Sequence, residues 1–280
     1  MLVVGLAGFA YSGYVWYTKI FSNTDRIFYG MVDKSLTTDS VTRSISQNDA
    51  SRSENQAYYI SFSPDSAIQS VSKVDQIGQD RQKSSVTTET MGTRTADYVS
   101  YKAIQIPSTG ADQPDYSKVI GKWAKRDASG DSGQQAQFLN EAIFTFIPFG
   151  NFSQENKDKL TTILHEKNVY ELNNSKITYE GGRPTLNVDV SINPRGLVET
   201  LKEYATITGL GNQDLLDPSQ YDNNNSFVVG VKVDMLSRHL KKITYPGDTR
   251  EETYEAYGLN KNIKLPEQTI SVEDLQKQLQ

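Results

Sequence analysis

Residues 169–209 read VYELNNSKITYEGGRPTLNVDVSINPRGLVETLKEYATITG, and this stretch decides the fold. From Leu186 to Ile192, apolar and polar residues alternate without a break, which is typical of a strand with one buried face. The pair Gly181-Gly182 precedes this run and suits a tight turn. The stretch therefore predicts an antiparallel hairpin with strands at 169–179 and 184–192.

A helix is predicted directly after the hairpin. Asn193 can cap its amino end, Pro194 suits the first helical position, and Gly209 can end it. The apolar positions of this helix recur at helical spacing and are Leu197, Leu201, Tyr204 and Ala205. A hairpin followed by a capped amphipathic helix favours a fold that mixes sheet and helix.

The rest of the chain repeats these two patterns. Short alternating runs rich in Ser, Thr, Tyr and Val between 41 and 106 predict four or five antiparallel strands with one solvated face. Further strands are predicted at 227–233, 240–245 and 251–257. Helices are predicted at 23–36, 138–146 and 153–164, with a short one after the capping box at 271–274, whereas 107–135 is predicted to be mostly loop. The fold class is therefore α+β, with a large antiparallel sheet.

Composition excludes several classes of protein. The chain has 280 residues, a net charge of −5 and no basic run, so nucleic acid is not an expected partner. With no cysteine there is no disulfide, thiolate metal site or catalytic thiol. Sixteen tyrosines favour strands over a helical bundle.

The amino-terminal segment is predicted to lie in a membrane. Residues 1–18 carry no charged side chain and end in a Trp/Tyr cluster suited to a membrane interface. Cleavable-signal features are not clear, and a buried core helix is the structural alternative. By the positive-inside rule, Lys19, Arg26 and Lys34 would place the following domain in the cytoplasm. We expect it outside the cytoplasm instead, because a basic leader before Met1 would reverse that comparison and because the domain resembles an exported one.

These observations give a division of the chain. Residues 1–20 are a membrane anchor or uncleaved signal, 21–266 a single extracytoplasmic α+β domain, and 267–280 a C-terminal helical tail. The predicted location is the cell membrane, as a single-pass protein with the bulk of the chain extracytoplasmic.

No pattern of catalytic residues is recognisable. Neither histidine, His165 or His239, lies near a nucleophile or at metal-ligand spacing. Two acidic loops, at 127–133 and 222–226, lack the glycine and the closing glutamate of a calcium loop. Adjacent carboxylates such as Glu251 and Glu252 are expected on any acidic surface and do not by themselves indicate a glycosidase. We expect no enzyme, no cofactor and no metal.

Several carboxyl-half patterns resemble the bacterial lipoprotein-carrier fold, to which LolA, LppX and LprG belong. These are Gly182-Arg183-Pro184 with the Pro194 helix, Val231–Asp234 leading to Tyr257-Gly258, and Ile263-x-x-Pro266. Together they cover roughly the last two-fifths of the chain. The resemblance implies a curved half-barrel sheet with helices packed on one face and an apolar space that shelters acyl chains. The lipobox cysteine of LppX-type proteins is absent, since Phe9 stands at its place.

Two functions are therefore expected for a non-catalytic membrane-anchored protein. The first is binding of a lipid or other apolar ligand between sheet and helices, with residues 138–146 as a lid. The residues predicted to line that site are Phe138, Ile143, Phe146, Leu186, Val188 and Val190. The alternative is a cell-envelope scaffold or protein-interaction module with a filled core. A continuous apolar cavity would favour the first function, and a packed interface the second.

Overall fold

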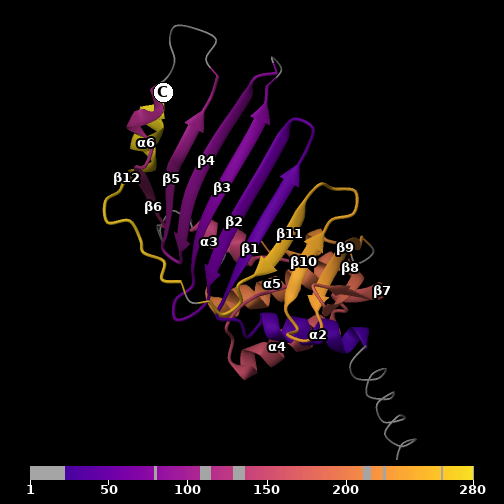
Figure 1. Cartoon of the computed structure of the whole chain (residues 1–280). Coiled ribbons are helices and arrows are strands. Elements are labelled where there is room, and N and C mark those ends of the chain that lie inside the picture. The colour runs from indigo at the N-terminus through magenta and orange to yellow at the C-terminus, as the bar shows by residue number, and fades with distance from the viewer. Residues whose placement is uncertain are drawn as a thin grey trace, which may run out of the picture.

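The structure is a computed structural model that describes residues 23–78, 81–107, 115–128, 136–210, 216–222, 225–259 and 261–279. It contains one large sheet and several helices (Figure 1). The strands are β1 (Ser40–Asn48), β2 (Arg52–Ser61), β3 (Ala67–Ile77), β4 (Lys83–Thr93), β5 (Ala96–Gln105), β6 (Trp123–Asp127), β7 (Tyr170–Glu180), β8 (Arg183–Ile192), β9 (Phe227–Asp234), β10 (Leu240–Thr244), β11 (Glu251–Glu255) and β12 (Ile270–Ser271). The α-helices are α2 (Thr24–Ser35), α3 (Gln137–Ile143), α4 (Gln154–Glu166), α5 (Pro194–Thr208) and α6 (Val272–Leu279).

All twelve strands join in the order β12-β6-β5-β4-β3-β2-β1-β11-β10-β9-β8-β7. Neighbouring strands are antiparallel, except that the short β12 pairs parallel with β6. Because β1 pairs with both β2 and β11, the amino-terminal meander and the carboxyl-terminal strands form one continuous surface. Figure 1 shows this surface as open and curved, with long strands on one side and most helices gathered at the other end.

The predicted hairpin and helix are confirmed. β7 and β8 pair across Gly181 and Gly182, both of which have the positive φ that this tight turn requires. In α5, the side chain of Asn193 accepts a hydrogen bond from the Gly196 N–H, and Gly209 takes the left-handed conformation at the carboxyl end. The turn glycines and the helix caps therefore lie at the positions that the sequence predicted.

One hydrophobic core joins the sheet to four helices. Buried side chains of α2, α3, α4 and α5 pack with inward residues of β8, β9 and β10. They also pack with Val41, Ile60 and Ile68, which lie at the helix-covered ends of β1, β2 and β3. We call the sheet face that carries Val41, Ile60 and Ile68 the inner face, and the opposite one the outer face. The helices therefore cover one face of the sheet, at one end.

Two sequence predictions were wrong in detail. Residues 123–127 form β6, although the stretch 107–135 was expected to be mostly loop; pairing with β5 orders this segment, in which three of five residues are charged. The predicted helix 138–146 ends at Ile143, because Phe144 takes an extended conformation and the Thr145 hydroxyl donates to the Ile147 carbonyl at 2.5 Å. Phe146 therefore lies beyond the helix rather than on it.

The α+β class with a large, open, curved and mostly antiparallel sheet is confirmed. The predicted membrane helix at 1–20 lies outside the described residues, which begin at Asn23. Among the described helices, none is long and apolar enough to span a bilayer. The carboxyl-terminal helix α6 packs on the β6 edge through its buried residue Leu275.

Candidate functional site

The structure places the six predicted ligand-binding residues in or against the main core. Ile143, Leu186, Val188 and Val190 are fully buried there. Phe138 and Phe146 are partly buried and pack on the same cluster, where the Phe146 ring lies 5.0 Å from that of Phe227. The helices and the sheet thus meet at these positions through tightly packed side chains. Whether an apolar ligand enters between them remains a prediction.

Helix α3 is held on the sheet by a polar clamp. The Asp97 carboxylate on β5 accepts the Gln137 N–H at 2.8 Å and the Phe138 N–H at 3.1 Å. Arg126 on β6 donates to the same carboxylate at 2.7 Å. Asp97 therefore supplies the cap that α3 lacks locally, because Ala136 has no side chain to cap with.

Close packing at Gly92 completes this contact. A Cβ atom at Gly92 would lie 2.8 Å from the Leu139 backbone nitrogen and 3.0 Å from the Phe138 Cβ. Only glycine allows the helix to lie this close to β4. α3 is thus fixed both by charge at its amino end and by backbone contact along its side.

A buried polar cluster marks the place where the core ends. Glu252 on β11, 1% exposed, accepts a hydrogen bond from Arg43 on β1, 5% exposed, at 2.8 Å. The Tyr254 and Tyr245 hydroxyls donate to Glu252 at 2.7 and 2.5 Å, and Arg250 donates at 2.8 Å. Arg43 also donates to the Ala142 carbonyl just before the end of α3. The cluster therefore joins β1, β11 and the residue that follows β10 to α3, on the inner face.

The charges in this cluster are matched. Burial alone would raise the pKa of Glu252, but the Arg43 charge and the hydrogen bonds from Arg43, Tyr245 and Tyr254 outweigh it and lower the pKa to about 2. Burial raises the pKa of Tyr254 well above its ordinary value. The carboxylate is thus ionised and the tyrosine neutral at physiological pH, so the cluster holds no group poised to exchange a proton.

Beyond this cluster the strands continue without helices. We call residues 45–48, 52–57, 71–77 and 83–88 the uncovered ends of β1, β2, β3 and β4, which Figure 1 shows extending past the helices. On their inner face one row runs across the pairing register, formed by Ile45, Gln56, Ser72 and Thr88. Nearer the core, the Ser70 and Thr90 hydroxyls lie 2.7 Å apart. The next row outward from Ile45, formed by Gln47, Glu54, Val74 and Val86, mixes polar and apolar side chains, so this surface is mostly polar with isolated apolar residues.

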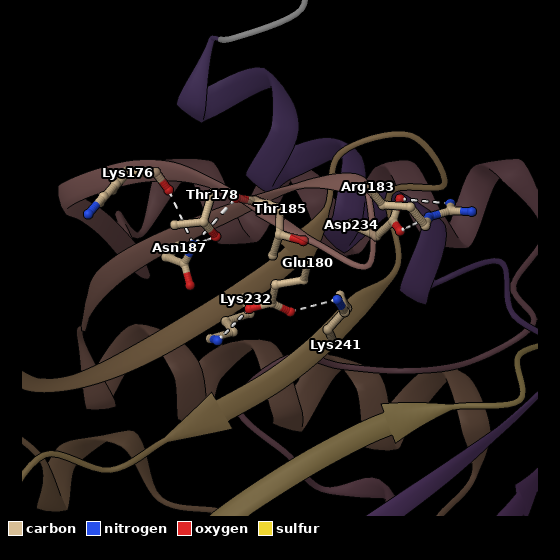
Figure 2. A network of polar contacts seen from close by, with 9 residues as sticks. All are labelled: Lys176, Thr178, Glu180, Arg183, Thr185, Asn187, Lys232, Asp234 and Lys241. Carbon is tan, nitrogen blue, oxygen red and sulfur yellow. Dashed lines mark hydrogen bonds and ion pairs between the residues drawn. The ribbon is translucent and has the colours of Figure 1, made fainter.

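At the other end of the sheet, ion pairs bind the strands on the outer face (Figure 2). Glu180 accepts hydrogen bonds from Lys232 at 2.6 Å and Lys241 at 2.8 Å, which lower its pKa to about 2. Arg183 holds both carboxylate oxygens of Asp234. Since Asp234 also accepts backbone N–H groups of the following turn, this pair fixes the β9–β10 turn.

Surface depressions in the described part of the chain include four whose linings contain none of the six predicted residues. The largest of the four, about 570 Å³, lies between Trp123 and residues 266–270 at the β6 edge. Another, about 300 Å³, lies on the uncovered ends between β1, β2 and β11 and includes Val71 and Glu251. Both are shallow and open to solvent.

The histidines have structural contacts. The His165 ring stacks on Tyr29 at 4.1 Å, and the His239 ring stacks on Tyr257 at 4.0 Å. Burial and the nearby Lys34 charge lower the pKa of His239. Among the described residues, no group of three His, Asp or Glu side chains could hold a metal ion.

Sequence reasoning missed the buried cluster. Glu251 and Glu252 were considered together, but adjacent strand residues face opposite sides of a sheet, so only Glu252 is buried. The alternation of Glu252 and Tyr254 on one strand face was the available signal. Its partner Arg43 lies on a distant strand and could not be inferred from spacing.

Comparison with known proteins adds little. No protein-family model and no curated protein matches the sequence. Among solved structures, the chain is similar to LprF from Mycobacterium bovis, with a TM-score of 0.42 and 11% sequence identity over 86% of this chain and 95% of that chain. At this level, the similarity carries no argument about ligand or function.

Proposed function

We propose that the chain is a non-catalytic extracytoplasmic interaction module, tethered to a membrane by residues 1–20, which binds a protein partner on the uncovered ends of β1–β4. The observation that carries this proposal is that these strands extend beyond the core that the helices cover. On the inner face of β3, residues change from fully buried at Ile68 to half-buried at Val74 and exposed at Gln76.

An energetic argument supports a binding role for these ends. Ordering a residue costs roughly 1–2 kcal/mol of backbone entropy, and burial of apolar surface is the main compensation. The apolar residues on this face, Ile45, Val74 and Val86, are only half-buried, and the others are polar. Stability of the fold is therefore a poor explanation for long strands here, whereas a wide, mostly polar surface with a few apolar side chains suits recognition of another protein.

Photocrosslinking in cells tests this proposal. A photoreactive amino acid at Ser72 or Thr88 should give an adduct of one discrete mass. The same amino acid at Glu155, an exposed residue of α4 on the covered end, should not. Absence of an adduct from both uncovered positions, or an equal adduct from Glu155, would contradict a partner-binding role for these ends.

The proposed location is tested separately. A reporter fused after Gln280 should be accessible from outside intact cells. An inaccessible reporter would contradict the extracytoplasmic placement, whatever the partner.

One observation favours the second function, the sheltering of an apolar ligand. Phe138, Phe144 and Phe146 pack against the core without being fully buried, so α3 and the residues after it could open as a lid. Native mass spectrometry of the chain, followed by organic extraction, decides this point. Co-purified lipid would support the ligand-binding function, and a chain that neither carries nor takes up lipid would exclude it.

A further inference from the structure

A row of cations lies on one stripe of α2. Arg26, Gly30 and Lys34 are four residues apart, so they fall on the same side of the helix. Arg26 and Lys34 are exposed, and within the described residues neither forms an ion pair. Asp25 is one residue away from Arg26 and therefore does not share its face.

Arg238 completes this row from the β9–β10 turn. Its side chain lies across Gly30, where an added Cβ would be 3.6 Å from the Arg238 Cδ. A positive φ of 58° holds the residue in this position. Its Nη1 atom is buried without a hydrogen-bond partner. Three cations therefore lie in line along α2, and one guanidinium nitrogen of the central cation, Arg238, has no hydrogen-bond partner.

The carboxylates close to this row are already engaged. Asp33 pairs with Lys157 at 2.6 Å, and Asp234 pairs with Arg183 at 2.7 Å beside α2 (Figure 2). Burial and the nearby Arg26 charge lower the pKa of Arg238, as expected when no carboxylate offsets the repulsion. The row thus retains its positive charge although the whole chain is acidic.

An apolar side chain accompanies the charges. Leu236, in the same turn as Arg238, is 58% exposed. Cations beside an exposed leucine suit the interface of an anionic bilayer, where phosphates take the charges and the apolar side chain enters the headgroup region.

We infer that this surface, defined by Arg26, Lys34, Leu236 and Arg238, docks on the phosphate groups of anionic phospholipids. The inference rests on the proposed membrane tether, because α2 begins at Thr24, five residues after Lys19, which follows the uncharged residues 1–18. The tether would bring this face of α2 to the bilayer. The inference also gives Arg26 and Lys34 a role in docking besides their count in the positive-inside rule.

The test uses the full chain in lipid vesicles. Because the chain has no cysteine, Ser237→Cys offers a single site for an environment-sensitive fluorophore beside Arg238. Vesicles of phosphatidylcholine, with or without phosphatidylglycerol, carry brominated lipids that quench the fluorophore on contact. Quenching should increase several-fold with phosphatidylglycerol and fall again at high salt.

Charge-reversal variants test whether this surface, rather than the net charge of the chain, causes the binding. The variant Arg26→Glu/Lys34→Glu changes two exposed residues and should lower the docked fraction at least tenfold, since each cation contributes roughly fivefold. The control Lys118→Glu/Lys264→Glu makes the same change in net charge at the far edge and should keep the quenching. A second variant, Arg238→Gln, should weaken it about fivefold.

Three results would overturn the inference. These are quenching without dependence on phosphatidylglycerol, an unchanged response in Arg26→Glu/Lys34→Glu, or an equal loss in the control. If one of these results is obtained, vesicle flotation tests the tether separately. Flotation of the chain with phosphatidylcholine vesicles would leave the proposed tether intact. A chain that floats with no vesicles overturns the tether itself.

Discussion

The two ends of the long strands differ in what holds them. At the covered end, Val41, Ile60 and Ile68 pack into the core beneath α3. At the uncovered end, the same strands carry Gln47, Glu54 and Gln76 on the same face. Backbone pairing continues without interruption between the two ends.

This difference shows that strand pairing and core formation are separable along one strand. A sheet can continue past its hydrophobic core when each strand has ordered neighbours on both sides, because the backbone hydrogen bonds remain satisfied. The uncovered ends then offer side chains whose contribution to folding is small. The Arg43–Glu252 cluster lies at the transition and closes the core against solvent.

The largest effect is expected from removing the charge at this transition. Glu252→Gln leaves Arg43 buried without a counter-ion and should lower the free energy of unfolding by about 3–5 kcal/mol. Urea unfolding measures this loss. Glu54→Gln, which breaks the exposed pair with Arg52 on an uncovered end, should cost less than about 1 kcal/mol.

The acid response of the variant is the control. The pKa of Glu252 in the folded chain, about 2, lies below its ordinary value of 4.5. The stability it contributes is therefore present above about pH 4.5 and is lost as the pH falls towards 2. Glu252→Gln should lack this part of the acid sensitivity. An unchanged pH profile would mean that another carboxylate is responsible.

The comparison is sharpest within β3. Ile68→Ala should cost about 2–5 kcal/mol, because it leaves a cavity in the core. Val74→Ala, a truncation on the same inner face at the uncovered end, should cost less than about 1 kcal/mol, because Val74 is only partly buried. Thermal or urea unfolding measures both. If the two costs were equal, the uncovered end would be part of the cooperative core.

A smaller effect is expected at the clamp on α3. Asp97→Ala removes the cap of the helix and the partner of Arg126, and should cost about 1–2 kcal/mol. Amide exchange should accelerate in α3 and remain unchanged in α5, which has its own cap at Asn193. Unchanged exchange in α3 would show that the contact at Gly92 is sufficient to hold it.

Local rules allowed most elements to be predicted from sequence. Alternation predicted β8, turn glycines placed the hairpin that it forms with β7, and caps bounded α2, α4 and α5. β6 was missed because this short segment, in which three of five residues are charged, is ordered by β5 rather than by its own pattern. The six predicted ligand-binding residues were recognised as apolar and inward-facing, but spacing could not show that they pack on one another.

The sequence by itself determined where strands, turns and capped helices occur, because these depend on neighbours a few residues apart. The tertiary structure alone decided which strand ends the helices cover and which charges meet. Asp97 caps a helix 40 residues away, and Arg43 meets a carboxylate 209 residues away. Contacts of this kind depend on the order of strands in the sheet, which short-range periodicity does not encode.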